Sequence, residues 1–146
     1  MNKICIDILL VEDNPMDAEL TIRTLKKHHL ANNIYTVTDG EQALNYLNCR
    51  GEFAEREKTC PRVIFLDIKL PKINGLEILK LIKANETLRN IPIVMLTSSA
   101  EDPDIEAAYA LGANSYVVKP VDINSFTETI NNLGMYWLGI NQPPKH

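Results

Sequence analysis

The sequence predicts an α/β fold, with a doubly wound parallel sheet of five strands covered by helices on both faces. Short apolar runs alternate with stretches of helical periodicity along most of the chain. Some of these runs, such as residues 63–66, are apolar without a break. Unbroken apolar runs are typical of strands that are buried on both faces of a parallel sheet. Alternation of such strands with helices is the pattern of a sheet enclosed between helical layers.

The five expected strands are short runs rich in β-branched and aromatic residues. They cover residues 5–11, 33–38, 62–67, 92–97 and 115–119. Right-handed crossovers leave few ways to order these strands. We expect the order 2-1-3-4-5, known as flavodoxin-like, in which the winding direction reverses between the first and third strands.

Five helices are indicated by apolar residues that recur at helical spacing. Four of these stripes consist of Ala18, Ile22, Leu25 and His29; of Ala43, Leu44 and Leu47; of Leu76, Leu79, Ile82 and Lys83; and of Ile105, Ala108 and Leu111. The fifth and longest contains Ile123, Phe126, Ile130, Leu133 and Trp137. Capping residues mark several helix ends: Asn14 before Pro15, Asp102 before Pro103, Asp122 before the last helix, and Gly112 after the fourth stripe.

The segment from Asn48 to Pro61 is the least regular part of the chain. We expect it to extend the second helix and then to form a charged surface loop. The strand that follows continues the same alternation, so this segment is not a domain boundary. We therefore expect residues 1–140 to form one domain and residues 141–146 to be a disordered tail.

Composition excludes several classes of protein. The chain has 146 residues, is 45% hydrophobic and carries a net charge of −4 without a basic stripe, so we expect no nucleic-acid partner. No apolar stretch approaches the ~20 residues of a membrane span, and the N-terminus does not resemble a signal peptide. The three cysteines have no metal-binding spacing. We expect a cytoplasmic protein with no membrane partner.

Polar residues with complementary chemistry follow four of the predicted strands. Glu12 and Asp13 follow the first strand, Asp67 ends the third, Thr97 ends the fourth and Lys119 ends the fifth. The carboxyl ends of parallel strands lie at one edge of a sheet, so these side chains should converge. Three carboxylates, a hydroxyl and an ammonium group can hold a divalent metal and a phosphoryl group together. The sequence therefore predicts a switch driven by phosphorylation.

These motifs resemble those of the two-component response regulator receiver family. The matching segments are residues 10–14, residues 65–71 with Gly75, residues 95–98 and residues 116–120, and the resemblance extends from about residue 5 to 138. Within the family, the chain is most similar to the single-domain, phytochrome-associated response regulators. The features that suggest this subgroup are the start at residues 12–15, the long segment before the third strand and the aromatic, apolar end at residues 135–138.

The resemblance implies roles for the residues of the predicted site. Asp67 is the nucleophile that receives a phosphoryl group as an acyl phosphate, and the donor is a phosphohistidine on a sensor histidine kinase or a phosphotransfer protein. A Mg²⁺ cofactor is held directly by Asp13 and Asp67, through water by Glu12, and by the main-chain carbonyl of Lys69.

Three further residues take part in the implied switch. Thr97 and Lys119 bind the phosphoryl oxygens, and Tyr116 turns inward when Thr97 moves. The resemblance also implies a cis peptide bond between Lys119 and Pro120.

The expected output is a contact with another protein. The nine residues after Trp137 leave no room for a DNA-binding helix-turn-helix, so the partners are a kinase, a phosphotransfer protein or a second copy of the chain. The apolar residues Tyr136, Trp137, Leu138 and Ile140 would either form part of a homodimer face or cover the chain's own core. We expect no enzymatic activity beyond the protein's own phosphotransfer and dephosphorylation.

Three alternatives come from other classes of protein. An aspartate-nucleophile phosphatase would need a second acid two residues after Asp67, where this chain has Lys69. A flavin-binding electron carrier shares the strand order, but the acidic loop at residues 12–15 would repel its phosphate. A phosphorylation-independent interaction module would not need the full acidic set.

Overall fold

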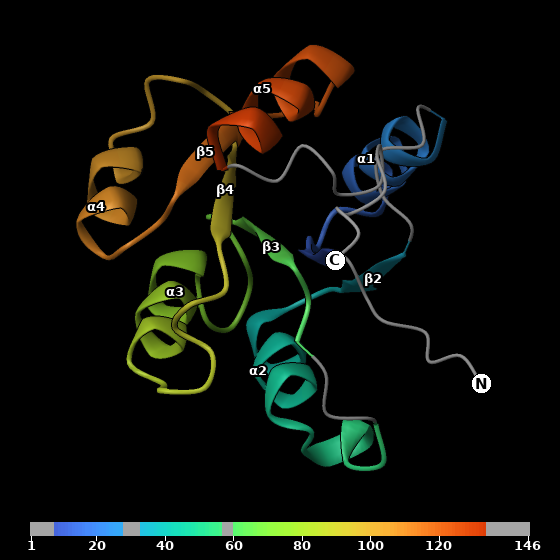
Figure 1. Ribbon diagram of the computed structural model, residues 1–146, viewed down its shortest axis with the longest axis vertical. Helices are drawn as coiled ribbons and strands as arrows, with labels where there is room; N and C mark the ends of the chain where they lie inside the picture. The colour runs from blue at the N-terminus through green and yellow to red at the C-terminus, as the bar shows by residue number, and fades with distance from the viewer. Residues whose placement is uncertain (1–7, 28–32, 57–59, 134–146) are drawn as a thin grey trace, which may run out of the picture.

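Strands and helices alternate along the chain in the computed structural model, which describes residues 8–27, 33–56 and 60–133 (Figure 1). The elements are β1 (Ile8–Val11), α1 (Pro15–Lys27), β2 (Ile34–Val37), α2 (Gly40–Asn48), the 3₁₀-helix η1 (Gly51–Phe53), β3 (Val63–Asp67), α3 (Gly75–Lys83), β4 (Ile93–Thr97), α4 (Asp104–Ala110), β5 (Ser115–Val118) and α5 (Ile123–Leu133). The five strands form one parallel sheet in the order β2-β1-β3-β4-β5. The predicted flavodoxin-like fold and its strand order are confirmed.

The register of the sheet brings the carboxyl ends of the inner strands together. Across neighbouring strands, Val11 pairs with Leu66, Asp67 with Leu96, and Thr97 with Val118. The residues that follow β1, end β3 and β4, and follow β5 therefore lie along one edge. This placement depends only on pairing between short strands.

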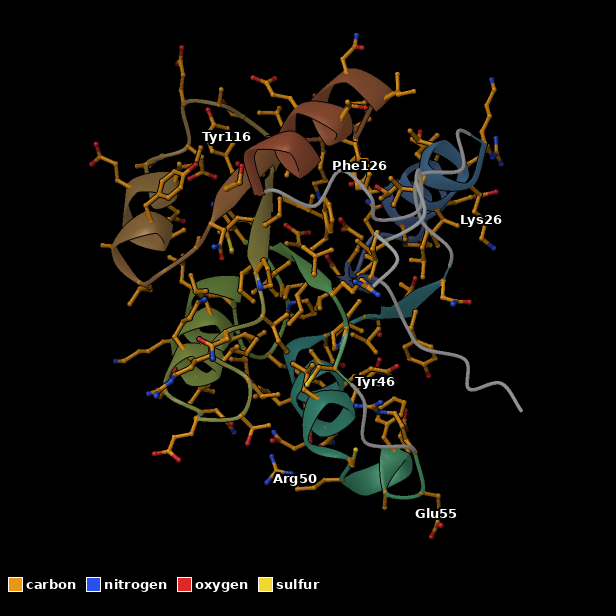
Figure 2. All side chains as sticks on the ribbon, viewed as in Figure 1. Lys26, Tyr46, Arg50, Glu55, Tyr116 and Phe126 are labelled. Carbon is orange, nitrogen blue, oxygen red and sulfur yellow. The ribbon has the colours of Figure 1, made fainter. Side chains whose placement is uncertain are left out.

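Two apolar cores lie on opposite faces of the sheet. One packs α2, α3 and α4 against β1, β3 and β4, and its members include Tyr46 and Ile78. The other packs α1 and α5 against the opposite face. There the rings of Phe65 and Phe126, both fully buried, stack with their centroids 5.7 Å apart. Tyr46 of α2 and Phe126 of α5, which belong to the first and second core respectively, are labelled in Figure 2. Both faces of the central strands are thus buried, which explains why their sequences are apolar without a break.

Polar side chains begin several helices as the sequence predicted. The Asn14 side chain accepts hydrogen bonds from the main-chain N–H groups of Met16 and Asp17, and Asp122 accepts one from Ser125. At α4 the prediction is off by one residue. Asp102 accepts a bond from the N–H of Asp104, but the helix begins at Asp104 rather than at Pro103. Each such cap contributes about 1 kcal/mol to helix stability.

The segment after α2 differs from the prediction. The helix does not extend beyond Asn48, because Cys49 takes a left-handed conformation (φ 54°) and caps it. A short 3₁₀-helix follows instead. Arg56 then turns back over α2, where its guanidinium donates two hydrogen bonds to the Tyr46 carbonyl and lies 3.9 Å from the centre of the Tyr46 ring. These contacts hold residues 51–56 against the helix as a surface turn.

Strands β2 and β5 are slightly shorter than predicted. β2 covers residues 34–37, one residue fewer at each end than predicted. β5 covers residues 115–118, one residue fewer at its carboxyl end. Residues 5–7 of the predicted first strand lie outside the described part, as do Trp137 and the predicted tail at 141–146. Among the described residues, none of the helices has the length and apolar character needed to cross a bilayer.

Gly75 allows the loop after β3 to pack tightly beside the edge of the sheet. Its N–H donates a 2.8 Å hydrogen bond to the Ile68 carbonyl. A Cβ atom at this position would collide with the main-chain carbonyl oxygen of Asp67 and would lie 2.9 Å from the Cα of Ile68. Backbone atoms cannot rotate away as a side chain can, so only glycine fits here.

We expect Gly75→Ala to lower the free energy of unfolding by about 2 kcal/mol or more, because the added methyl group must displace the backbone of β3. Urea unfolding followed by circular dichroism measures the change. Lys80→Ala, at an exposed position of the same helix, is the control and should change stability by less than about 0.5 kcal/mol. Equal stability of the Gly75→Ala variant and the parent would contradict the close approach described here.

Candidate functional site

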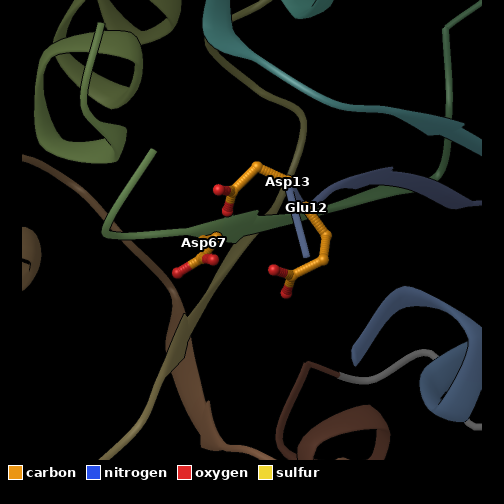
Figure 3. A group of neighbouring side chains, drawn as sticks. All are labelled: Glu12, Asp13 and Asp67. Carbon is orange, nitrogen blue, oxygen red and sulfur yellow. The ribbon is translucent and has the colours of Figure 1, made fainter. Parts of the chain in front are cut away.

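Three carboxylates meet where β1 and β3 end. One oxygen each from Glu12, Asp13 and Asp67 lies within 4.8 Å of the other two (Figure 3). Glu12 and Asp67 are buried, with 1% and 3% of their surfaces exposed, whereas Asp13 is exposed. Asp13 therefore leaves the cluster open to solvent on one side.

Lys119 reaches this cluster from the carboxyl end of β5. Its Nζ lies 3.1 Å from Asp67 Oδ2 and 3.2 Å from Glu12 Oε1, and it donates to both. Burial lowers the pKa of Lys119, but the neighbouring charges of Asp67 and Glu12 outweigh burial and raise it above its usual value. These charges thus favour the protonated, positively charged form of Lys119. The expected cis peptide bond between Lys119 and Pro120 is present.

Burial and a neighbouring acid together perturb Glu12. Loss of solvent is the largest cause, followed by a hydrogen bond with Asp67 and the negative charge of Asp67. These effects raise the pKa of Glu12 from its usual 4.5 to about 7, although Lys119 and the N–H of Asn14 oppose them. In the absence of a metal ion, Glu12 therefore competes for a proton near neutral pH.

The charges of the site fit a divalent cation. Three ionised carboxylates carry three negative charges, and Lys119 neutralises only one of them. Carboxylate oxygens are the ligands that Mg²⁺ prefers, and the exposed side of Asp13 leaves room for the water molecules that Mg²⁺ retains. Asp67 is oriented by its own loop, because the N–H of Lys69 donates to Asp67 Oδ1 at 3.1 Å. The role of the Lys69 carbonyl as a ligand stays a prediction.

Thr97 lies buried at the end of β4, and its hydroxyl faces two acceptors. The Oγ1 atom is 3.1 Å from the Ser99 carbonyl and 3.2 Å from Asp102 Oδ2. A hydroxyl has one hydrogen to donate, so these two acceptors share it. In this state Thr97 is bonded within the loop that leads to α4.

Tyr116 lies on β5, where it pairs with Met95 of β4. Its side chain is half-buried and packs at the margin of the core under α2, α3 and α4 (Figure 2). The ring makes an edge contact with Tyr109 of α4, with the centroids 6.3 Å apart. The predicted inward movement of this ring stays a prediction.

Two acids at the site were missed by the sequence analysis. Asp17 Oδ2, from the first turn of α1, lies 3.1 Å from Lys119 Nζ. Asp102 contacts Thr97, as described above. Asp17 follows the predicted N-cap Asn14, and Asp102 is itself a predicted N-cap. The sequence therefore indicated that both lie near the carboxyl edge of the sheet. Their contacts depend on side-chain geometry, which the sequence does not show.

Comparison with protein families and known proteins identifies similar chains. A family model described as the response regulator receiver domain matches residues 8–131. Response regulator Rcp1 of Synechocystis sp. (strain ATCC 27184 / PCC 6803 / Kazusa) is 34% identical over 131 residues, which cover 90% of this chain and 88% of that protein.

Three solved structures resemble the whole fold. The bacteriophytochrome response regulator RtBRR is 50% identical, with a TM-score of 0.85, and the match covers 97% of this chain and 85% of that one. The Mn²⁺-bound form of Rcp1 is 33% identical, with a TM-score of 0.73 and coverage of 94% and 98%. The phosphorylated cyanobacterial phytochrome response regulator RcpA is also 33% identical, with a TM-score of 0.73 and coverage of 97% and 98%. The predicted resemblance to phytochrome-associated response regulators is confirmed.

The raised pKa of Glu12 predicts how the stability of the metal-free protein depends on pH. A carboxyl group whose pKa is higher in the folded than in the unfolded state favours folding below its unfolded value of 4.5, and this contribution is lost as the pH rises through about 7. Glu12→Gln removes the titration while keeping the size of the side chain. We expect this variant to gain stability relative to the parent between pH 5 and 8, by on the order of 2 kcal/mol.

Urea unfolding in the presence of EDTA, repeated across this pH range, measures the difference. Glu86→Gln, which changes an exposed glutamate, controls for the loss of a charge. The stability of this variant should depend on pH in the same way as that of the parent. A difference between the Glu12→Gln variant and the parent that does not change with pH would contradict the assignment.

Proposed function

The chain belongs to the response regulator receiver family, and from this membership we propose that Asp67 accepts a phosphoryl group and that the phosphorylated protein signals through protein contacts. The observation that carries the proposal is the set of charged groups around Asp67. The carboxylate lies at the edge of the sheet beside two further acids and 3.1 Å from the Lys119 ammonium. This arrangement provides a nucleophile, a candidate metal site and a cation for the transferred group at one place.

Asp67 is the proposed nucleophile. A carboxylate oxygen forms a bond to phosphorus while the bond between phosphorus and the donor nitrogen of a phosphohistidine breaks, and the electron pair leaves with the imidazole. Asp13 and Asp67 would hold Mg²⁺ directly, with Glu12 through water and the Lys69 carbonyl, and the ion would neutralise charge on the transferred group. Lys119 already contacts Asp67 Oδ2, so a short movement brings its ammonium to a phosphoryl oxygen.

Thr97 is the proposed link between the phosphoryl group and the surface. Its hydroxyl must leave the Ser99 carbonyl and Asp102 to donate to a phosphoryl oxygen. Asp102 also accepts from the N–H of Asp104, so this exchange loosens a contact at the start of α4. Tyr116 then moves inward, and the surface formed by α4, β5 and α5 changes.

The available interaction energy is of the size that a switch requires. A hydrogen bond to a charged group contributes about 1.5–3 kcal/mol, so Thr97 and Lys119 together supply ~3–6 kcal/mol. Converting a two-state equilibrium from mostly inactive to mostly active needs ~5.5 kcal/mol. Both contacts are therefore required, and the loss of either should impair switching.

The proposed phosphoryl donor is a sensor histidine kinase or a histidine phosphotransfer protein. Similarity to bacteriophytochrome response regulators favours a phytochrome-type sensor kinase as the source. The proposed setting is the cytoplasm, and the chain turns over no external substrate. Association with a second copy stays a proposal, because its predicted face at residues 136–140 lies outside the described part of the chain.

The central prediction is covalent phosphorylation at one residue. Incubation with Mg²⁺ and acetyl phosphate should add one phosphoryl group to the parent, and Asp67→Asn should abolish the addition because the amide is not nucleophilic. Intact-mass spectrometry measures both. Asp104→Asn, at the start of α4, is the matched control and should be phosphorylated like the parent.

Other outcomes would favour the alternatives. Sustained release of phosphate from assorted phosphoesters would support an aspartate-nucleophile phosphatase. Phosphorylation of the Asp67→Asn variant, or none in the parent, would contradict the proposal, and the second result would favour a phosphorylation-independent interaction module.

A second prediction separates phosphorylation from switching. Thr97→Ala should still accept a phosphoryl group, but it should lose most of the structural response, since one hydrogen bond worth about 1.5–3 kcal/mol is removed. Hydrogen exchange of the amides in α4 and β5, with and without acetyl phosphate, measures the response. Thr97→Ser keeps the hydroxyl and should respond as the parent does. A full response in the Thr97→Ala variant would show that another residue carries the signal.

A further inference from the structure

Asp17 provides a third carboxylate for Lys119 from outside the acidic cluster. It lies in the first turn of α1, its side chain is 35% exposed, and its Oδ2 atom is 3.1 Å from Lys119 Nζ. The other two partners of this ammonium, Glu12 and Asp67, belong to the three-carboxylate cluster. Asp17 is not part of that cluster, so its contact with Lys119 needs a separate explanation.

The position of Asp17 is set by a closed chain of contacts. Glu12 Oε2 accepts a bond from the N–H of Asn14, and the Asn14 side chain accepts one from the N–H of Asp17. The Asp17 carboxylate contacts Lys119, which in turn donates to Glu12. The start of α1 is therefore connected to Lys119 in two ways: directly through the Asp17 carboxylate, and indirectly through Asn14 and Glu12.

An acid in the first turn of a helix has a simpler explanation, because it interacts favourably with the positive end of the helix dipole. That explanation accounts for an acid at this position. It does not account for the 3.1 Å distance between Asp17 Oδ2 and Nζ of Lys119, which follows the carboxyl end of β5. Lys119 donates hydrogen bonds to Glu12 and Asp67, and Asp17 adds a third carboxylate as an ion pair. Asp17 thus completes the surroundings of the lysine.

The contact becomes more important once the cluster carries a cation. Glu12 and Asp67 would then share their negative charge with the metal, and the metal would repel the nearby ammonium. Asp17 would be the partner whose charge remains with Lys119. Without Asp17, repulsion by the metal would favour an orientation of the ammonium toward solvent over one beside Asp67.

We propose that Asp17 is a positioning residue that holds the Lys119 ammonium beside Asp67 while the acidic cluster carries its metal ion. The inference rests on the proposed function, since it assigns Asp17 a part in preparing Lys119 for the phosphoryl group. It predicts that Asp17 acts through Lys119 and not as a metal ligand.

The direct test measures the chemical reactivity of Lys119 in the Mg²⁺-loaded protein. A free amine reacts with acetic anhydride, whereas an ammonium held by carboxylates is protected, and peptide mass spectrometry follows the Lys119 peptide. We expect Asp17→Asn to raise the rate of acetylation by about fivefold, as for the loss of a partly exposed ion pair. Asp17→Glu keeps the charge and should restore much of the protection.

Glu19→Gln is the matched control on the same helix. Glu19 is exposed and pairs with Arg23 rather than with Lys119, so its loss should leave the acetylation rate unchanged. Circular dichroism of all three variants shows whether α1 remains folded. A rate of Lys119 acetylation in the Asp17→Asn variant equal to that of the parent would overturn the proposal.

A second readout compares phosphorylation with metal binding. With acetyl phosphate and saturating Mg²⁺, Asp17→Asn should be phosphorylated about fivefold more slowly, while calorimetry should show a smaller change in Mg²⁺ affinity. Phosphorylation at the parent rate or faster would mean that Asp17 does not assist Lys119. If the parent itself is not phosphorylated, the proposed function fails, whereas the acetylation result still reports on the contact.

Discussion

Unbalanced negative charge at one edge of the sheet is the constraint on which the rest of the site depends. One oxygen each from Glu12, Asp13 and Asp67 lies within 4.8 Å of the other two, and two of these residues are buried. Like charges at this distance are costly unless a proton, a cation or a metal ion offsets them. Lys119 offsets one charge, while burial, followed by the hydrogen bond with Asp67 and its negative charge, raises the pKa of Glu12 to about 7. A site of this kind is prepared to bind a divalent cation.

The fold maintains this arrangement through contacts that lie away from the charged groups. Parallel pairing in register places the end of β1 beside the end of β3, and the two apolar cores hold both strands from either face. Gly75 lets the loop after β3 lie against the Asp67 backbone. Asn14 fixes the start of α1, and with it the Asp17 carboxylate. The stability of the fold thus supports a cluster that is unfavourable by itself.

The sequence predicted the strand order and the convergence at the edge because both follow from chain topology. Apolar runs identify the strands, and polar residues at their ends must meet once the strands are parallel. Finer features were beyond its reach. Cys49 ends α2 in a left-handed conformation that glycine usually adopts. Because the residue is a cysteine, the sequence did not indicate that the helix ends there. The contacts of Asp17 and Asp102 depend on rotamers and on one-residue differences in where a helix begins, as the start of α4 at Asp104 illustrates.

The most direct test of the central claim is to locate a bound metal ion. Crystals of the protein soaked in Mn²⁺, which scatters anomalously and accepts the same oxygen ligands as Mg²⁺, would reveal its position. The account predicts a single strong anomalous peak in contact with the carboxylates of Asp13 and Asp67, close to Glu12. A fully soaked crystal with no peak among these carboxylates, or with its peak elsewhere on the molecule, would contradict it.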